Sequence, residues 1–137
     1  MHFTTPHLPL CHTCATLTRV SIAAKQVAIR PYIQDLTTLA TALELSQDDL
    51  GRMFAVSGET IRRWRNGSAI PLEARAKIAE ALAGLERLQR IFLPESLAPA
   101  TRRKAQAFDG DSAFDWILRG RIRDVADIYE FVLSYQG

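Results

Sequence analysis

Three arginines, Arg62, Arg63 and Arg65, lie within four residues of one another in the stretch "SGETIRRWRNG". Arginine forms paired hydrogen bonds with phosphate or guanine, and threonine and asparagine suit the DNA backbone or adenine. Ile61 and Trp64 are three residues apart, so on a helix they share one face and leave the other to the polar side chains. The stretch therefore predicts a helix that reads DNA. Its expected contact residues are Ser57, Glu59, Thr60, Arg62, Arg63, Arg65 and Asn66.

A helix that enters the major groove must be held away from the protein body, and the preceding stretch "SQDDLGRMFAV" predicts a short partner helix. Ser46 is a preferred N-cap, and aspartates follow in the first turn. A three-residue turn, Ala55-Val56-Ser57, would join the two helices as in a helix-turn-helix. Glycine is common in such turns, whereas here Gly51 lies inside the first helix. The apolar residues expected to lock the pair are Leu50, Phe54, Val56, Ile61 and Trp64.

The net charge of +2 is too small to demand a nucleic-acid partner. Arginines on a helix often serve only to keep it solvated, which is the plain alternative here. The short paired helices, the tight turn and the three arginines occur together, however, and this combination favours DNA binding.

Apolar residues recur at steps of three and four along most of the chain, which is typical of amphipathic helices. No stretch alternates with the period of two that marks a strand. Pro99 is expected either to lie in the first turn of its helix or to break it. The predicted fold is all-α. The expected helices cover about residues 31–43, 46–54, 57–66, 71–93, 95–107, 112–118 and 121–135.

The last predicted helix is apolar around about 220° of its circumference, which is wide for a surface helix. Its first apolar face consists of Ile122, Val125, Ala126, Tyr129, Val132 and Leu133. A neighbouring face consists of Ile128, Phe131 and Tyr135. One face can pack on the short helix that contains Phe114, Trp116, Ile117 and Leu118. The other face either contacts another protein or is buried inside a small bundle, and the pattern alone leaves both open.

The chain carries few signs of catalysis or metal binding. Cys11 and Cys14 form one C-x-x-C, but a zinc site needs about four ligands, so spectator cysteines are favoured over a site completed by His2 and His7. No Ser/His/Asp set, carboxylate pair or glycine loop is evident. We therefore expect no enzyme, no cofactor and no metal.

The composition, with 47% hydrophobic and 23% charged residues, is that of an ordinary globular protein. No apolar run approaches the ~20 residues of a membrane span. The first residues lack the pattern of a signal peptide. We expect a cytoplasmic protein with reduced thiols and no membrane partner.

Two stretches resemble a known family. The stretch "LSQDDLGRMFAVSGETIRRWRNGSAIP" resembles the Xre-type helix-turn-helix, and "AFDGDSAFDWILRGRIRDVADIYEFVLSYQG" resembles the toxin-binding domain of Xre/MbcA/ParS-type antitoxins. The likeness spans roughly residues 36–137, and the order of the halves matches. The short "DWILRGR" helix and the acidic-aromatic final helix are the more specific part. The implied domains are a variable leader over 1–30, a helix-turn-helix domain over 31–93 and a toxin-binding domain over 94–137.

In that family the antitoxin neutralises a RES-domain toxin, which uses or degrades NAD, and its C-terminal helix and tail cover the active-site cleft of the toxin. The complex often represses its own operon. The resemblance implies that this chain is the antitoxin of a type II module, which binds a cognate RES-domain toxin and operator DNA as a homodimer within the complex. The implied toxin contacts are Trp116, Arg119, Ile128, Phe131, Tyr135, Gln136 and Gly137, with the last two as the plug.

The chain departs from the family pattern at two places. Many members have proline where this chain has Ala113, and a common Gly-Gly turn is reduced to Asp109-Gly110. The first ~35 residues match nothing in the family and have the character of a dispensable leader. The alternative function is a stand-alone helix-turn-helix repressor whose C-terminal helices only form a dimer.

Overall fold

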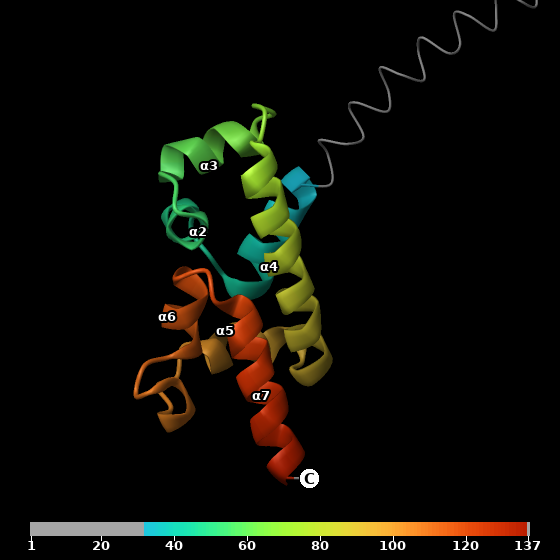
Figure 1. The fold of residues 1–137 in the computed structure, drawn as a ribbon, viewed down its shortest axis with the longest axis vertical. Coiled ribbons are helices and arrows are strands. Elements are labelled where there is room, and N and C mark those ends of the chain that lie inside the picture. Colours follow the sequence, from blue (N-terminus) through green and yellow to red (C-terminus); the bar gives the residue numbers. More distant parts are fainter. Residues whose placement is uncertain (1–31, 137) are drawn as a thin grey trace, which may run out of the picture. The chain divides into compact units, whose positions relative to one another are not determined.

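The computed structural model describes residues 32–136, which we call the helical unit. The elements in this range are helical, with one isolated antiparallel bridge between Lys104 and Ser112, so the all-α prediction is confirmed. Residues 32–43 are helical and come first. The elements that follow, labelled in Figure 1, are α2 (Gln47–Phe54), α3 (Gly58–Arg65), α4 (Leu72–Ile91), α5 (Pro94–Thr101), the 3-10 turn η1 (Gln106–Phe108), α6 (Ala113–Leu118) and α7 (Ile122–Gln136).

Serine side chains begin three of these helices. The Ser46 hydroxyl accepts a hydrogen bond from the N–H of Asp49 at 3.0 Å, and the Asp49 carboxylate accepts one from the N–H of Ser46 at 3.0 Å. Ser112 and Asp115 form the same reciprocal capping box before α6, and the Ser57 hydroxyl caps α3. Each cap satisfies helix N–H groups that would otherwise lack a partner and stabilises the helix by about 1 kcal/mol.

The glycine that shapes the turn between α2 and α3 lies inside α2 rather than in the turn itself. Ala55, at φ 58° and ψ 41°, adopts the left-handed conformation that glycine usually supplies. Gly51 lies one turn earlier, where an added Cβ would be 2.6 Å from the carbonyl oxygen of Val56. The N–H of Val56 donates to the Gly51 carbonyl at 2.8 Å. Gly51 therefore allows the turn to fold back closely on α2, which sets the position of α3.

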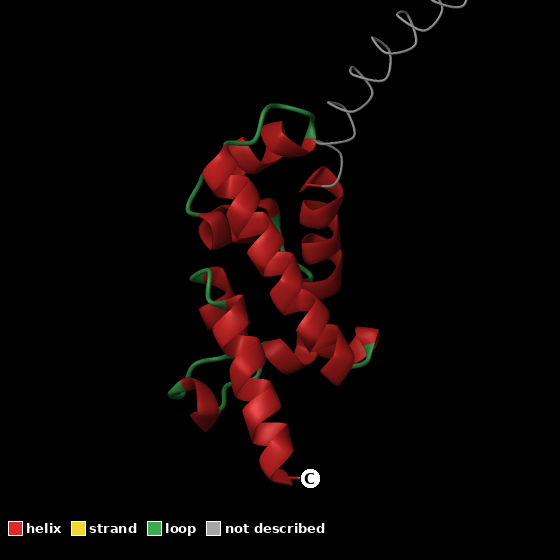
Figure 2. Cartoon of the chain, turned by 45° about the vertical axis from the view of Figure 1, so that its right-hand side comes forward, coloured by secondary structure: helices red, strands yellow, loops and turns green. Residues whose placement is uncertain are grey.

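The long helix α4 packs along α7, as both ribbon views show (Figures 1 and 2). Gly84 makes the approach close, because a Cβ there would lie 3.1 Å from the Ile122 side chain. These helices stand on opposite sides of the domain boundary expected at residue 93, and that boundary stays a prediction. The largest fully buried side chains of the unit are Leu36, Leu39, Leu43, Leu50, Ile61, Ile78, Leu85, Leu88, Leu97, Phe108, Ile117 and Val125.

The helix expected over residues 95–107 is shorter in the structure. Its first position is taken by Pro94, and Pro99 lies in its interior rather than in the first turn or at a break. The helix ends at Thr101, where the N–H groups of Arg102 and Arg103 donate to the carbonyls of Pro99 and Ala100 at 3.2 and 3.4 Å in tighter i+3 turns. The chain then forms a hook in which the N–H of Ala105 donates to the carbonyl of Asp111 at 3.0 Å.

The hook carries Phe108 into the core, where it is 1% exposed. Its ring meets Trp116 and Tyr129 edge-to-face, with centroids 5.4 and 5.3 Å away. This aromatic cluster ties η1, α6 and α7 together. Edge-to-face pairs of this kind add about 0.5–1.5 kcal/mol beyond the area that they bury.

The last turns of α7 extend past the helices on which its first turns pack (Figures 1 and 2). Ile122, Val125 and Ala126 are buried as predicted. Leu133, expected on the same internal face, is 45% exposed, because α7 has by then run beyond its packing partners. In the range 32–136, no helix combines the length and hydropathy that a membrane span requires.

Candidate functional site

The predicted DNA-binding residues lie on or beside α3. Ile61 and Trp64 face inward and are 0% and 4% exposed, so the prediction that Trp64 belongs to the core is confirmed. The side chains of Arg62 and Arg63 are exposed, whereas Arg65 and Thr60 are half-buried. Exposed positions at the two ends of the helix complete the predicted set, and these are Ser57, Glu59 and Asn66.

Glu59 changes the electrostatics of this helix. Its carboxylate accepts a hydrogen bond from Arg62 Nε at 2.9 Å and pairs with Arg63 Nε at 3.6 Å. The hydrogen bond from Arg62 lowers the pKa of the Glu59 carboxyl, so the carboxylate stays charged. Two of the three arginines that are predicted to contact DNA therefore share one anion. Spacing of three and four residues on a helix brings these side chains together, so the sequence does contain the signal for this pairing.

Other polar groups of α3 take part in its ends. The hydroxyls of Ser57 and Thr60 lie 2.9 Å apart, and the N–H of Thr60 donates to Ser57 Oγ at 3.1 Å. Asn66 is the C-cap residue, and its N–H donates to the Arg62 carbonyl at 3.0 Å. Ser57 therefore has a structural task at the position where a DNA contact was predicted.

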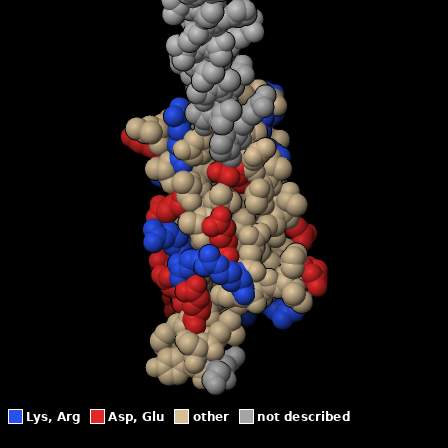
Figure 3. All heavy atoms as spheres, turned by 90° about the vertical axis from the view of Figure 1, so that its right-hand side faces the viewer, with Lys and Arg blue, Asp and Glu red and all other residues tan. Residues whose placement is uncertain are grey.

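The second predicted surface lies at the end of α7. Phe131, Leu133 and Tyr135, which we call the α7 tip, are 61%, 45% and 79% exposed. The rings of Phe131 and Tyr135 lie against each other with centroids 4.7 Å apart. Figure 3 shows this lower end of the molecule without charged side chains, in contrast to the face above it. Residues 131–135 indeed contain no Asp, Glu, Lys or Arg.

An apolar groove of about 480 Å³ continues the α7 tip toward the body. Ile128 is half-buried there, and it lines the groove with Ala107, Asp127, Phe131 and Val132. The structure thus brings three predicted toxin contacts, Ile128, Phe131 and Tyr135, onto the outer half of one helix. Leu133, which the sequence predicts on the first, inward apolar face, is also exposed.

Trp116 and Arg119 are placed elsewhere and do not line this apolar groove. Trp116 is 7% exposed, and the guanidinium of Arg121 lies 4.1 Å from the centre of its ring. Its buried Nε1 has no hydrogen-bond partner among the described residues. Arg119 is exposed and pairs with Asp111 at 3.4 Å. Of these two, Arg119 is the side chain with more surface available to a partner.

Ion pairs connect α7 to α4. Arg87 donates from Nε to Glu130 at 2.9 Å and also pairs with Asp127. A second bridge joins Arg123 to Glu80 at 2.9 Å. The hydrogen bond from Arg87 lowers the pKa of the Glu130 carboxyl. We call the set Arg87, Asp127 and Glu130 the α4–α7 clamp. Asp127 and Glu130 lie 40 and 43 residues from Arg87 along the chain, so no local sequence pattern predicts the clamp.

Several predictions fall outside the described residues. These are the leader over 1–30 with Cys11 and Cys14, the terminal Gly137, and the side chain of Gln136. Within residues 32–136 there is no cluster of His, Cys, Asp and Glu that could hold a metal ion.

Comparisons with known proteins bear on the fold. No protein-family model matches the chain. The uncharacterised protein y4oB of Sinorhizobium fredii is 28% identical to it over 102 residues, which span 72% of this chain and 79% of that protein. A chain in the crystal structure of the M. tuberculosis MbcT–MbcA toxin–antitoxin complex is similar, with a TM-score of 0.56 and 13% identity. The match covers 72% of this chain and 89% of the other, so the two share an arrangement of helices.

Proposed function

We propose that this chain is an antitoxin, a protein that binds and inhibits a partner toxin and is not itself an enzyme. The observation that carries the proposal is the exposed α7 tip on a fold shared with a chain of a toxin–antitoxin complex. Adjacent aromatic side chains that water surrounds are costly unless a partner covers them, and aromatic residues are the usual anchors of protein interfaces.

The partner that we propose is a RES-domain toxin that uses NAD. The support is the family resemblance of the "DWILRGR" helix and the final helix. In this account Phe131 and Tyr135 are the anchors at the mouth of the cleft of the toxin, and Ile128 extends the contact along the apolar groove. Gln136 and Gly137 follow as the plug. Arg119 forms a polar contact at the rim, and Trp116 supports the neighbouring surface from the core.

The toxin contact is tested by co-expression with the product of the neighbouring reading frame. An antitoxin restores growth to cells that the neighbour alone arrests, and the two proteins purify together. The alternative function, a stand-alone repressor, predicts instead that the chain purifies alone as a dimer and that cells arrested by the neighbour stay arrested. Arrested growth in the presence of a folded chain would reject the antitoxin proposal.

We further propose that α3 binds operator DNA and represses the operon of the module, with a homodimer matching two half-sites. The exposed arginines and the buried Trp64 support this orientation. Substitution of Arg62, Arg63 and Arg65 by alanine leaves up to three phosphates without a cation, so the salt slope of binding falls by about 0.9 for each such phosphate. Unchanged operator affinity in the triple variant at every salt concentration would reject this assignment.

A further inference from the structure

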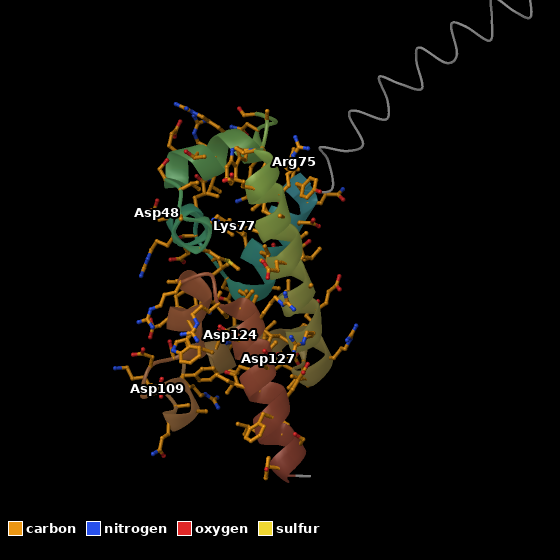
Figure 4. The ribbon with its side chains drawn as sticks, in the orientation of Figure 1. Asp48, Arg75, Lys77, Asp109, Asp124 and Asp127 are labelled. Carbon is orange, nitrogen blue, oxygen red and sulfur yellow. The ribbon has the colours of Figure 1, made fainter. Side chains whose placement is uncertain are left out.

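A second groove lies apart from the exposed face of α3 and from the α7 tip. It is formed by the end of α2, the middle of α4 and the turn from α6 to α7, and its volume is about 370 Å³. Gly120, at φ +80°, brings the turn close to α2, because a Cβ there would lie 3.2 Å from the carbonyl oxygen of Met53. In Figure 4, Lys77 on α4 and Asp124 on α7 mark two sides of this groove.

The polar lining of the groove is strongly biased toward positive charge. Its carboxylates are Glu80 and Asp124. Both are already paired, Glu80 with Arg123 and Asp124 with Arg121, each at 2.9 Å. The cations come from three separate segments, and they are Arg52, Lys77, Arg119, Arg121 and Arg123.

Two of the cations have no compensating carboxylate. Arg119 pairs with Asp111, outside the groove, but neither Arg52 nor Lys77 forms an ion pair with any residue in the described range. Both side chains belong to exposed residues, one on α2 and one on α4. Like charges that line one small space repel each other, and a bound anion relieves that repulsion.

We propose that this groove binds a small phosphorylated ligand of nucleotide size, with Arg52 and Lys77 as its phosphate contacts. Arginine and lysine are the side chains that proteins use most for phosphate. The first turn of α7 lines the same groove, so the positive end of its dipole adds to the field. The volume lies within the range of about 300–1,000 Å³ that small-molecule sites occupy.

The remaining lining favours a nucleotide over inorganic phosphate. Met53, Phe54, Ala81 and Ile122 line the groove beside the cations, each through the small part of its side chain that core packing leaves uncovered. A ligand with both an apolar ring and a phosphate matches such a mixed lining. The recessed form of the groove favours a small molecule over duplex DNA, whose backbone is met by side chains that protrude. The inference does not depend on the antitoxin proposal.

The experiment is isothermal titration of the full chain with ADP, adenosine and inorganic phosphate, together with binding of a labelled DNA duplex. The test variant is Arg52→Ala combined with Lys77→Ala. The matched control is Arg90→Ala, which removes an exposed cation from the same helix α4 but outside the groove. Thermal unfolding of each variant verifies the fold, which should persist because these side chains are exposed.

The proposal predicts that ADP binds, that adenosine and inorganic phosphate bind more weakly, and that the double variant loses at least about tenfold in ADP affinity. The control should bind ADP as the native chain does. Absence of ADP binding to the native chain would overturn the proposal, as would equal affinities in all three proteins. A double variant that loses DNA binding alone would also overturn it and would make the groove a DNA contact.

Discussion

Glu59 is the side chain that most alters what the three arginines of α3 can do. Its carboxylate holds Arg62 and Arg63, the two most exposed of them, on the surface where DNA is proposed to bind. DNA phosphates must compete with this carboxylate for the same donors. The lowered pKa of Glu59 means that the pairing is present at neutral pH and is lost only as the pH falls through that lowered value.

Replacement of Glu59 by glutamine should therefore strengthen DNA binding. We expect an affinity gain of about three- to fivefold at low salt, since a solvent-screened charge on the surface has only a modest effect. The measurement is a salt series of duplex binding. Glu73→Gln removes an exposed carboxylate from the first turn of α4 and is the matched control. Equal affinities in the native chain and Glu59→Gln would contradict the proposed role of α3.

Ala55 offers a test of the turn between α2 and α3. A residue with a Cβ is strained in the left-handed conformation that Ala55 adopts. Ala55→Gly should raise the free energy of unfolding by about 0.5–1 kcal/mol, because relief of strain exceeds the extra entropy of the unfolded chain. Urea unfolding measures this difference. The control Ala76→Gly, in the interior of α4, should lower stability instead. Loss of stability in both variants would contradict the strained left-handed conformation of Ala55.

Among whole helices, α7 depends on the α4–α7 clamp for the position of its outer half. Its inner half carries the buried Ile122 and Val125, and Ile122 lies against Gly84 of α4. Further along, the ties include Arg87 with Asp127 and Glu130. Because Arg87 lowers the pKa of Glu130, the clamp holds at neutral pH and weakens as the pH falls through the lowered value.

Arg87→Ala should accelerate amide hydrogen exchange in residues 126–136 while leaving α2 and α3 unchanged. Native protein in buffer acidic enough to protonate Glu130, whose pKa lies below the ordinary glutamate range, should show the same local effect once intrinsic exchange rates are corrected. Hydrogen-exchange mass spectrometry reads out both. Lys77→Ala serves as the control, since this exposed cation of α4 has no partner among the described ion pairs. Unchanged protection of α7 in Arg87→Ala would contradict the proposed role of the clamp in holding the outer half of this helix.

Local patterns in the sequence were sufficient to predict most helices. The caps at Ser46 and Ser57 and the inward direction of Ile61 and Trp64 follow from neighbouring residues alone. Sequence reasoning could not foresee the role of Gly51, because its need arises from the close approach of Val56 rather than from its own backbone angle.

The surfaces were harder to predict than the helices. A helical wheel assigns Leu133 to the inner face, but it does not tell where α7 outruns its packing partners. Arg87 and Glu130 meet only because α4 and α7 lie side by side, and the cations of the 370 Å³ groove converge from three segments. Such proximity depends on tertiary packing, which periodicity does not encode.

For the molecule as a whole, folding and partner binding use different side chains. The core is completed by the inner half of α7 and the aromatic cluster around Phe108. The α7 tip lies beyond this core and contributes little to it. Changes at the tip should therefore affect binding without unfolding the protein, which makes the antitoxin proposal directly testable.

The most direct test is the affinity of the purified toxin for the chain carrying Phe131→Ser, Leu133→Ser and Tyr135→Ser. The matched control changes two exposed leucines elsewhere, Leu72 and Leu93, to serine. We predict that the triple variant keeps its melting temperature and loses at least about 100-fold in affinity, as expected when aromatic anchors are removed. The control should bind as the native chain does. A folded triple variant that binds the toxin with native affinity would contradict the central claim.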